Sequence, residues 1–340
     1  MKMTYETLVA VIEKAKKVKL KDLIGVIEEL YRETEIMNDS IDSYFKLYDL
    51  CELVLQQPLL EGSDSDFHNL TVTCARQDDY DMACRFLDKG LLQYPCSIDL
   101  LSDYLNYGMN CGRYEQSKKA YYLLLKQRNI WNWRAYHFSI SYLMESMSID
   151  LTDNTKDIQD MISDFQKKLP MHEESYMDEA EFLSRFSNCE TSERTFLSVL
   201  EYATSDNCPV QRTPKCDLKL ADYYYNSGKN LDKARALLDR CKRNSIEPQL
   251  SVNRNYVYLL SALCKMSQYY DLLAKETSPK VLPQECEKEK MVLDVYEDYH
   301  IAALKISDSR VQSCKGLIEA FIRETGITYP YEDDGIENMI

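Results

Sequence analysis

One pattern of side chains occurs twice, in YDMACRFLDKGLLQYP (residues 80–95) and, 34 residues later, in YEQSKKAYYLLLKQRN (residues 114–129). The shared positions are Tyr80, Ala83, Leu87, Gly90 and Pro95 in the first stretch, and Tyr114, Ser117, Tyr121, Leu124 and Asn129 in the second. A fixed period of this length is typical of proteins built from repeated two-helix hairpins. Because one hairpin cannot bury its apolar face alone, neighbouring hairpins stack and leave a long concave surface for binding.

Helices are expected along most of the chain, since only 9 Gly and 9 Pro occur among 340 residues and apolar residues recur three and four positions apart. We therefore predict an all-α fold in one continuous array of about 15 to 17 helices. The pattern divides it into an N-terminal helical cap or degenerate repeats at 1–60, a repeat array at 64–277, C-terminal capping helices at 284–325 and an acidic, mobile tail at 326–340. Inside the array the pattern slips by seven residues at SIDLTDN (148–154), which we interpret as an insertion in a hairpin turn.

At these positions the chain resembles the tetratricopeptide repeat (TPR) family. The second helix of a TPR unit carries Tyr, Ala, a bulky residue, a small residue and Pro, and residues 80–95 match all five positions. The small residues Ala83 and Gly90 are needed where two helices pack closely. The resemblance covers 64–277, most clearly in two or three units. It implies a right-handed superhelical solenoid of antiparallel helix hairpins, whose concave wall binds a protein or peptide segment.

The same register, carried onto this chain, implies a set of groove residues that are mostly polar or aromatic: His68, Arg76, Asn106, Asn110, Trp133, Tyr136, Lys219, Tyr223, Asn226 and Lys265. The bland interpretation is that each is a solvated side chain on an open face. Trp133 is the strongest candidate, because in NIWNWRAYHF (129–138) Trp131 can serve the core while Trp133 faces outward. Some TPR proteins bind a C-terminal carboxylate with paired Lys and Asn residues, but His68 and Val72 stand at those positions here.

Charge, apolar runs and cysteine content limit the ligands and the cellular location that can be expected for this protein. With 56 acidic and 41 basic residues the formal net charge is −15, which disfavours nucleic acid and anionic membranes as ligands. No run of about 18 uncharged apolar residues occurs, and Glu6 and Glu13 interrupt what would be the apolar part of a secretion signal. The 12 cysteines are scattered without a CxxC motif, as in reduced core positions. We therefore expect a cytoplasmic protein.

Motifs for catalysis or cofactor binding are not found. The sequence contains no glycine-rich phosphate loop, and its four histidines, His68, His137, His172 and His300, form no metal-binding pair such as HExxH. Paired acids such as Glu173 and Glu174 stand near expected helix starts, where carboxylates favour the helix dipole. We predict no cofactor, no metal site and no enzymatic activity.

The sequence thus predicts a non-catalytic scaffold or adaptor that binds a protein or peptide segment in its groove. One alternative is a regulatory subunit that senses a peptide and acts through a partner protein. Another is an RNA binder, because residues 244–273 resemble a unit of the pentatricopeptide family, although the acidic balance and the presence of one such unit oppose it. The charge also suggests that the acidic tail, residues 331–340, folds back into the groove.

Overall fold

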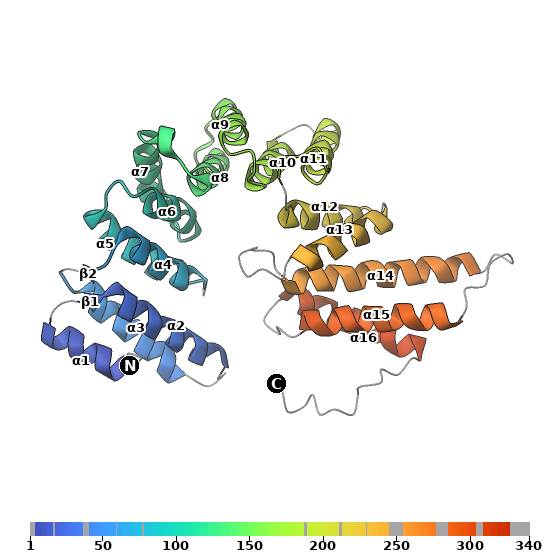
Figure 1. The fold of residues 1–340 in the computed structure, drawn as a ribbon, viewed down its shortest axis with the longest axis horizontal. Coiled ribbons are helices and arrows are strands. Elements are labelled where there is room, and N and C mark those ends of the chain that lie inside the picture. Colours follow the sequence, from blue (N-terminus) through green and yellow to red (C-terminus); the bar gives the residue numbers. More distant parts are fainter. Residues whose placement is uncertain are drawn as a thin grey trace. The chain divides into compact units, whose positions relative to one another are not determined.

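The computed structural model describes residues 4–15, 18–36, 41–58, 60–76, 78–186, 189–210, 213–228, 230–244, 254–276, 285–303 and 309–326. Over these residues the chain forms sixteen α-helices and two strands of two residues each (Figure 1). The predicted all-α class is confirmed. The predicted acidic tail falls, after Gly326, outside the described residues.

The chain divides into two compact units, Met1–Leu169 and Pro170–Ile340. This boundary falls within the predicted 64–277 array, and each unit is described by itself. The N-terminal unit contains α1 (Tyr5–Ala15), β1 (Val18–Lys19), α2 (Leu20–Ile36), α3 (Ile41–Leu55), β2 (Leu60–Glu61), α4 (Asp64–Ala75), α5 (Tyr80–Gln93), α6 (Ile98–Asn110), α7 (Tyr114–Leu125), the 3-10 turn η1 (Arg128–Ile130), α8 (Trp133–Asp150) and α9 (Thr155–Lys168). The C-terminal unit contains α10 (Glu174–Phe186), α11 (Cys189–Ala203), α12 (Pro214–Asn226), α13 (Leu231–Asn244), α14 (Arg254–Glu276), α15 (Glu285–Ala303) and α16 (Ser309–Thr325).

Local sequence signals set the helix ends. Ser63 and Asp66 form a capping box at the start of α4, where each side chain binds the other residue's backbone N–H. Gly112 adopts a φ of 75° in the turn between α6 and α7, a conformation that favours glycine. The connection between these two helices is therefore made at a glycine.

In the N-terminal unit, alternate helices pack against one another: α2 contacts α4, α4 contacts α6, and α6 contacts α8. Each of the four also packs against the helix that follows it. Side-chain hydrogen bonds recur across this stack at nearly constant separation. Tyr94 Oη donates to the Gly62 carbonyl 32 residues away at 2.6 Å, and Ser97 Oγ donates to an Asp64 carboxylate oxygen 33 residues away at 3.0 Å. Bonds at a similar separation join the preceding and the following helices, from Lys89 to the Gln57 carbonyl and from Asn132 to Asp99.

Gly90 on α5 shows why the pattern needs small residues. A Cβ atom at this position would lie 3.0 Å from the Phe67 ring and 3.1 Å from Leu100, and both side chains are fully buried. Ala83 and Leu87, on the same helix, are fully buried as well. The shared pattern of the two stretches therefore marks the packed face of α5.

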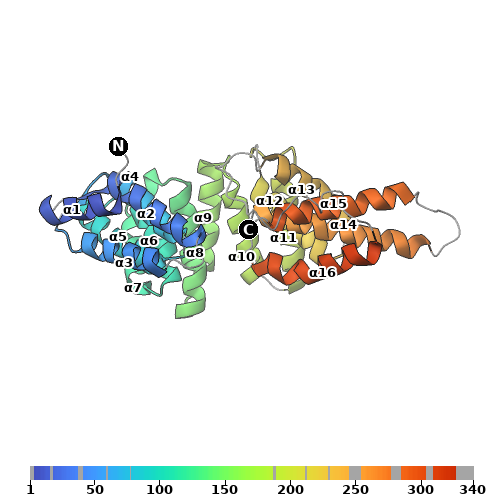
Figure 2. The same cartoon turned by 90° about the horizontal axis from the view of Figure 1, so that it is seen from below.

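In the C-terminal unit the long helix α14 joins two apolar clusters. Val257, Leu260 and Cys264 pack with residues of α10 to α13, whereas Leu259 and Leu263 pack with residues of α15 and α16. Helices α14 and α15 lie side by side, as both views show (Figure 1; Figure 2). The end of the unit is thus a layer of three helices built on α14.

The segment 148–154, predicted as an insertion in a hairpin turn, is divided between a helix and the turn that follows it. Helix α8 continues through Asp150, so the first three of these residues are helical. Residues 151–154 form the connection to α9, and it begins at Leu151, which has a left-handed backbone with a φ of 52°. The insertion therefore lengthens both α8 and the turn.

Candidate functional site

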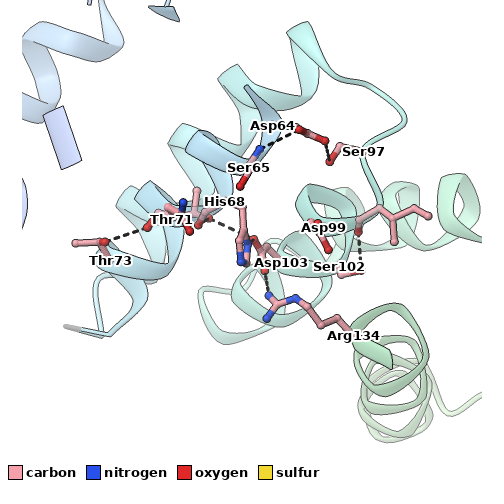
Figure 3. A network of polar contacts seen from close by, with 12 residues as sticks. Asp64, Ser65, His68, Thr71, Thr73, Ser97, Asp99, Ser102, Asp103 and Arg134 are labelled. Carbon is pink, nitrogen blue, oxygen red and sulfur yellow. Dashed lines mark hydrogen bonds and ion pairs between the residues drawn. The ribbon is translucent and has the colours of Figure 1, made fainter. Parts of the chain in front are cut away.

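A buried carboxylate joins three helices of the N-terminal unit. Asp103 on α6 is fully buried, and one of its oxygens lies 2.6 Å from Nδ1 of His68 on α4. Its other oxygen accepts a hydrogen bond from the guanidinium group of Arg134 on α8. Figure 3 shows Asp103 between these two side chains. Since a buried charge without a partner is strongly destabilising, Asp103 fixes both His68 and Arg134.

Arg134 extends this network into a group of partly exposed rings, which we call the aromatic patch and define as Trp133, Arg134, His137 and Phe138. The Arg134 guanidinium carbon lies 5.7 Å from the centre of the Trp133 ring and 5.3 Å from that of Phe138. The His137 ring lies 5.0 Å from the Phe138 ring. Cation–π attraction holds such a group together, so the patch is ordered before any partner binds.

The start of α8 places the indole of the patch. Asn132 caps the helix by accepting a hydrogen bond from the backbone N–H of Ala135 at 3.0 Å. Its Nδ2 donates to Asp99 of α6 at 2.9 Å. This side chain therefore fixes the first turn of α8, which carries Trp133, against α6.

Two predicted groove residues lie on α6, seven residues or fewer beyond Asp103 along the chain. Asn106 is partly exposed and Asn110 is exposed, and Asn110 Nδ2 donates to the Asn106 carbonyl at 2.8 Å. Arg76 is exposed at the end of α4. The amides and Arg76 thus lie on α6 and α4, the helices that Asp103 links to α8.

Tyr136 is a correction to the predicted groove. Its side chain is fully buried and stacks on Phe165 of α9 at 5.0 Å. Its hydroxyl donates to Asp164 of α9 at 2.7 Å. Trp131 is buried beside it, as expected, and its Nε1 donates to the Leu124 carbonyl at 2.8 Å. Tyr136 therefore serves the core, because α9 covers the side of α8 from which it projects.

The other four predicted groove residues belong to the C-terminal unit. Lys219 and Asn226 are exposed on α12, and Tyr223 is partly exposed with its ring 6.1 Å from Phe196. Lys265 was predicted to face the groove, but its Nζ lies 2.7 Å from Asp298 of α15 and its side chain is only 14% exposed. The charge of Lys265 is thus used within the fold.

Asp298 is the centre of a second buried polar cluster. It also binds Lys242 Nζ at 2.7 Å, and it accepts a hydrogen bond from the Ser261 hydroxyl at 2.7 Å. Burial pushes the pKa of Asp298 upward, but hydrogen bonds from Lys242 and Lys265 bring it below its usual value. Burial lowers the pKa of Lys242. The cluster joins α13, α14 and α15, and the sequence analysis missed it because its members are spread over more than 50 residues.

A hollow of about 530 Å³ lies between α11 and α13, with α12 as its floor. Three cations line it from α13: Lys233, Arg240 and Arg243. Arg240 is bound to the buried Asp217 and donates to the Thr204 carbonyl at 3.1 Å, whereas Lys233 and Arg243 are exposed. The sequence analysis missed this surface. The spacing of the three cations, which places them on one helical face, was the available signal.

The comparisons with known proteins find no match to any family model and no significant relative among curated proteins. Within the described part of the chain, no three His, Cys, Asp or Glu side chains are placed to hold a metal ion. None of the described helices combines the length and the apolarity needed to cross a membrane.

Proposed function

We propose that this chain is a non-catalytic, cytoplasmic scaffold or adaptor that binds a segment of another protein. The observation that carries the proposal is the aromatic patch, in which Asp103 orders Arg134 and Arg134 orders the partly exposed rings of Trp133 and Phe138. Rigid aromatic anchors often dominate the binding energy of protein interfaces. Because these rings are already held in place, they lose little side-chain entropy when a partner binds.

We further propose that the repeats form a TPR-like right-handed solenoid. Two features support this: the side-chain bonds that recur 32 or 33 residues apart, and the packing of alternate helices in the N-terminal unit. In that arrangement α4, α6 and α8 are the first helices of successive hairpins. Their common surface would hold the partner, with the amides of Asn106 and Asn110 available for hydrogen bonds to its backbone.

The test is affinity capture from the native host with the full chain as bait, comparing Trp133→Ala with Tyr122→Ala. Tyr122 is the matched control because it is an exposed aromatic on α7, outside the patch. We expect Trp133→Ala to reduce capture of a specific protein roughly 30-fold, as an anchor worth about 2 kcal/mol would. Tyr122→Ala should leave capture unchanged, and both variants should keep the helical circular dichroism of the parent.

Capture that is equal in the two variants would exclude the patch as the binding surface. Recovery of RNA in place of protein would support the pentatricopeptide-like alternative. A captured enzyme whose activity changes on adding a peptide would support the regulatory-subunit alternative.

The hollow in the C-terminal unit supports a second candidate, the binding of an acidic protein segment. Lys233 and Arg243 are exposed there, and the floor contributes Leu220 and Tyr224, so an amphipathic acidic helix would find both charge and apolar contact. Glu201 is the acidic exception, and it accepts a hydrogen bond from the Tyr224 hydroxyl at 2.7 Å. Salt-sensitive capture that is lost in Arg243→Ala but kept in Lys219→Ala would identify this surface.

A further inference from the structure

Two thiols touch in the N-terminal unit. The Sγ atoms of Cys84 on α5 and Cys111, which follows the last residue of α6, lie 3.5 Å apart although the residues are 27 positions apart in sequence. Cys84 is fully buried, and Cys111 is partly exposed. The pair therefore joins Cys111, a partly exposed residue, to a cysteine in the interior.

Arg113 keeps the two sulfurs opposite each other. Its guanidinium group donates to Asp81 at 2.7 Å and to Asp88 at 2.9 Å, and both aspartates are on α5. They lie three residues before and four residues after Cys84, which is the same face of the helix. The segment that carries Cys111 is thus clamped onto the part of α5 that carries Cys84.

We infer that Cys84 and Cys111 form a site of reversible oxidation, which a peroxide converts to an intramolecular disulfide. The Cys111 sulfur attacks one oxygen of hydrogen peroxide, the O–O bond breaks, and the sulfur becomes a sulfenic acid while hydroxide leaves with the Cys111 thiol proton as water. Cys84 sulfur then attacks the sulfenic sulfur, the S–OH bond breaks, and the Cys84 thiol proton leaves with the hydroxide as a second water. In total, two thiols lose two hydrogens and one peroxide is reduced to two waters.

The geometry requires little movement. A disulfide bond is about 2.05 Å long, so the sulfurs must approach by roughly 1.5 Å. Rotation of the Cys111 side chain leaves its backbone hydrogen bond to the Tyr107 carbonyl in place, and it changes the 3.7 Å contact between the sulfur and the Gly108 carbonyl. Burial raises the pKa of the Cys84 thiol well above its usual value. This agrees with the order given, in which Cys111 reacts first and Cys84 second.

The test is peptide mapping of the full chain after treatment with hydrogen peroxide, with free thiols then alkylated under denaturing conditions. Trypsin releases Cys84 in residues 77–85 and Cys111 in residues 90–113, but the second peptide also contains the exposed Cys96. The experiment therefore uses Cys96→Ser as the parent, so that a cross-link between these peptides can only join Cys84 to Cys111. We expect this cross-link, with a mass about 2 Da below the sum of the two peptides, and its loss on adding dithiothreitol.

Cys111→Ser, made in the same parent, is the matched control and should give no cross-link to residues 77–85. Peroxide that leaves both cysteines as alkylatable thiols would overturn the inference. So would a Cys84 cross-link to any other cysteine, or oxidation of Cys111 to sulfinic acid with Cys84 still a thiol. These outcomes do not depend on whether the aromatic patch binds a partner.

Discussion

At the scale of single residues, the fold depends on carboxylates that are buried and shared between helices. Asp103, Asp217 and Asp298 each bind a cation from another helix. Removing one partner of such a pair leaves an uncompensated charge in the interior, which costs more than the pair contributes to stability. These residues therefore restrict which helices can be neighbours.

Glu173 leads to a prediction about pH. Its buried carboxylate accepts hydrogen bonds from the backbone N–H groups of Lys215 at 3.0 Å and Cys216 at 3.2 Å, at the start of α12. Burial raises its pKa from 4.5 to about 7. Because the folded chain holds this proton more tightly than the unfolded chain, the contribution of Glu173 to the free energy of unfolding is fully present below about pH 4.5 and falls as the pH rises to about 7.

The test compares Glu173→Gln with the parent by urea denaturation at a series of pH values. The variant has no carboxylate to desolvate, so its stability relative to the parent should rise between pH 4.5 and 7, by about 3 kcal/mol in total. Glu181→Gln, at a partly exposed glutamate of α10 that pairs with Arg185, should follow the pH dependence of the parent. If the Glu173→Gln and parent curves stay parallel, the raised pKa is wrong.

Sequence reasoning located some of the site residues and not others. It assigned Trp131 to the core and Trp133 to the surface, and the structure has Trp131 buried and Trp133 partly exposed. It placed Tyr136 wrongly, since which side of α8 is covered depends on α9, a packing fact that helical spacing does not contain. It also missed Asp103 and Arg134, because the two residues lie 31 positions apart and no motif in the sequence connects them.

At the scale of elements, Gly25 and Gly108 provide a matched pair of substitutions. A Cβ atom at Gly108 on α6 would lie 2.4 Å from the Ser117 hydroxyl of α7, whereas one at Gly25 on α2 would meet no atom within 4 Å. Gly108→Ala should lower the free energy of unfolding by about 1–3 kcal/mol through overpacking. Gly25→Ala should raise it by about 0.5–1 kcal/mol, because alanine favours a helix over glycine.

Chemical denaturation of the two variants and the parent measures both effects. A Gly108→Ala variant as stable as the parent would show that α6 and α7 are not packed as described. A destabilising Gly25→Ala would contradict the open space described around Gly25 on α2.

Helix positions were predictable because their signals are local. The C-terminal capping helices expected at 284–325 correspond to α15 (Glu285–Ala303) and α16 (Ser309–Thr325), and the outer ends agree within one residue. The end of α8 was not predicted, because the slip in the repeat pattern at residues 148–154 gives the number of extra residues but not whether they continue the helix. Whether these residues continue α8 is seen only in the structure, where the helix extends to Asp150.

At the scale of the whole molecule, the division after Leu169 predicts that the N-terminal unit folds alone. A fragment of residues 1–169 should unfold cooperatively on heating, as judged by circular dichroism. A fragment of residues 1–112 is the control, because it lacks α7, α8 and α9 and leaves the surfaces of α6 that contact α7 and α8 uncovered. Non-cooperative unfolding of both fragments would mean that the N-terminal unit is not an independent domain.

The all-α class could be predicted from composition and periodicity, since these depend on averages over many residues. Which of the ten predicted groove residues belong to the same unit could not be predicted from the sequence. Six of them belong to the N-terminal unit and four to the C-terminal unit, and burial removes Tyr136 while an ion pair occupies Lys265.

The nearly constant separation of the side-chain bonds in the N-terminal unit bears on how the protein is made. Links such as Asp103 to Arg134 and Arg128 to Asp164 join residues only 31 and 36 positions apart. Each can therefore close soon after its second residue leaves the ribosome, while later helices are still being synthesised. The growing chain can add one hairpin at a time to hairpins that have already folded. Little apolar surface then stays exposed to solvent during synthesis.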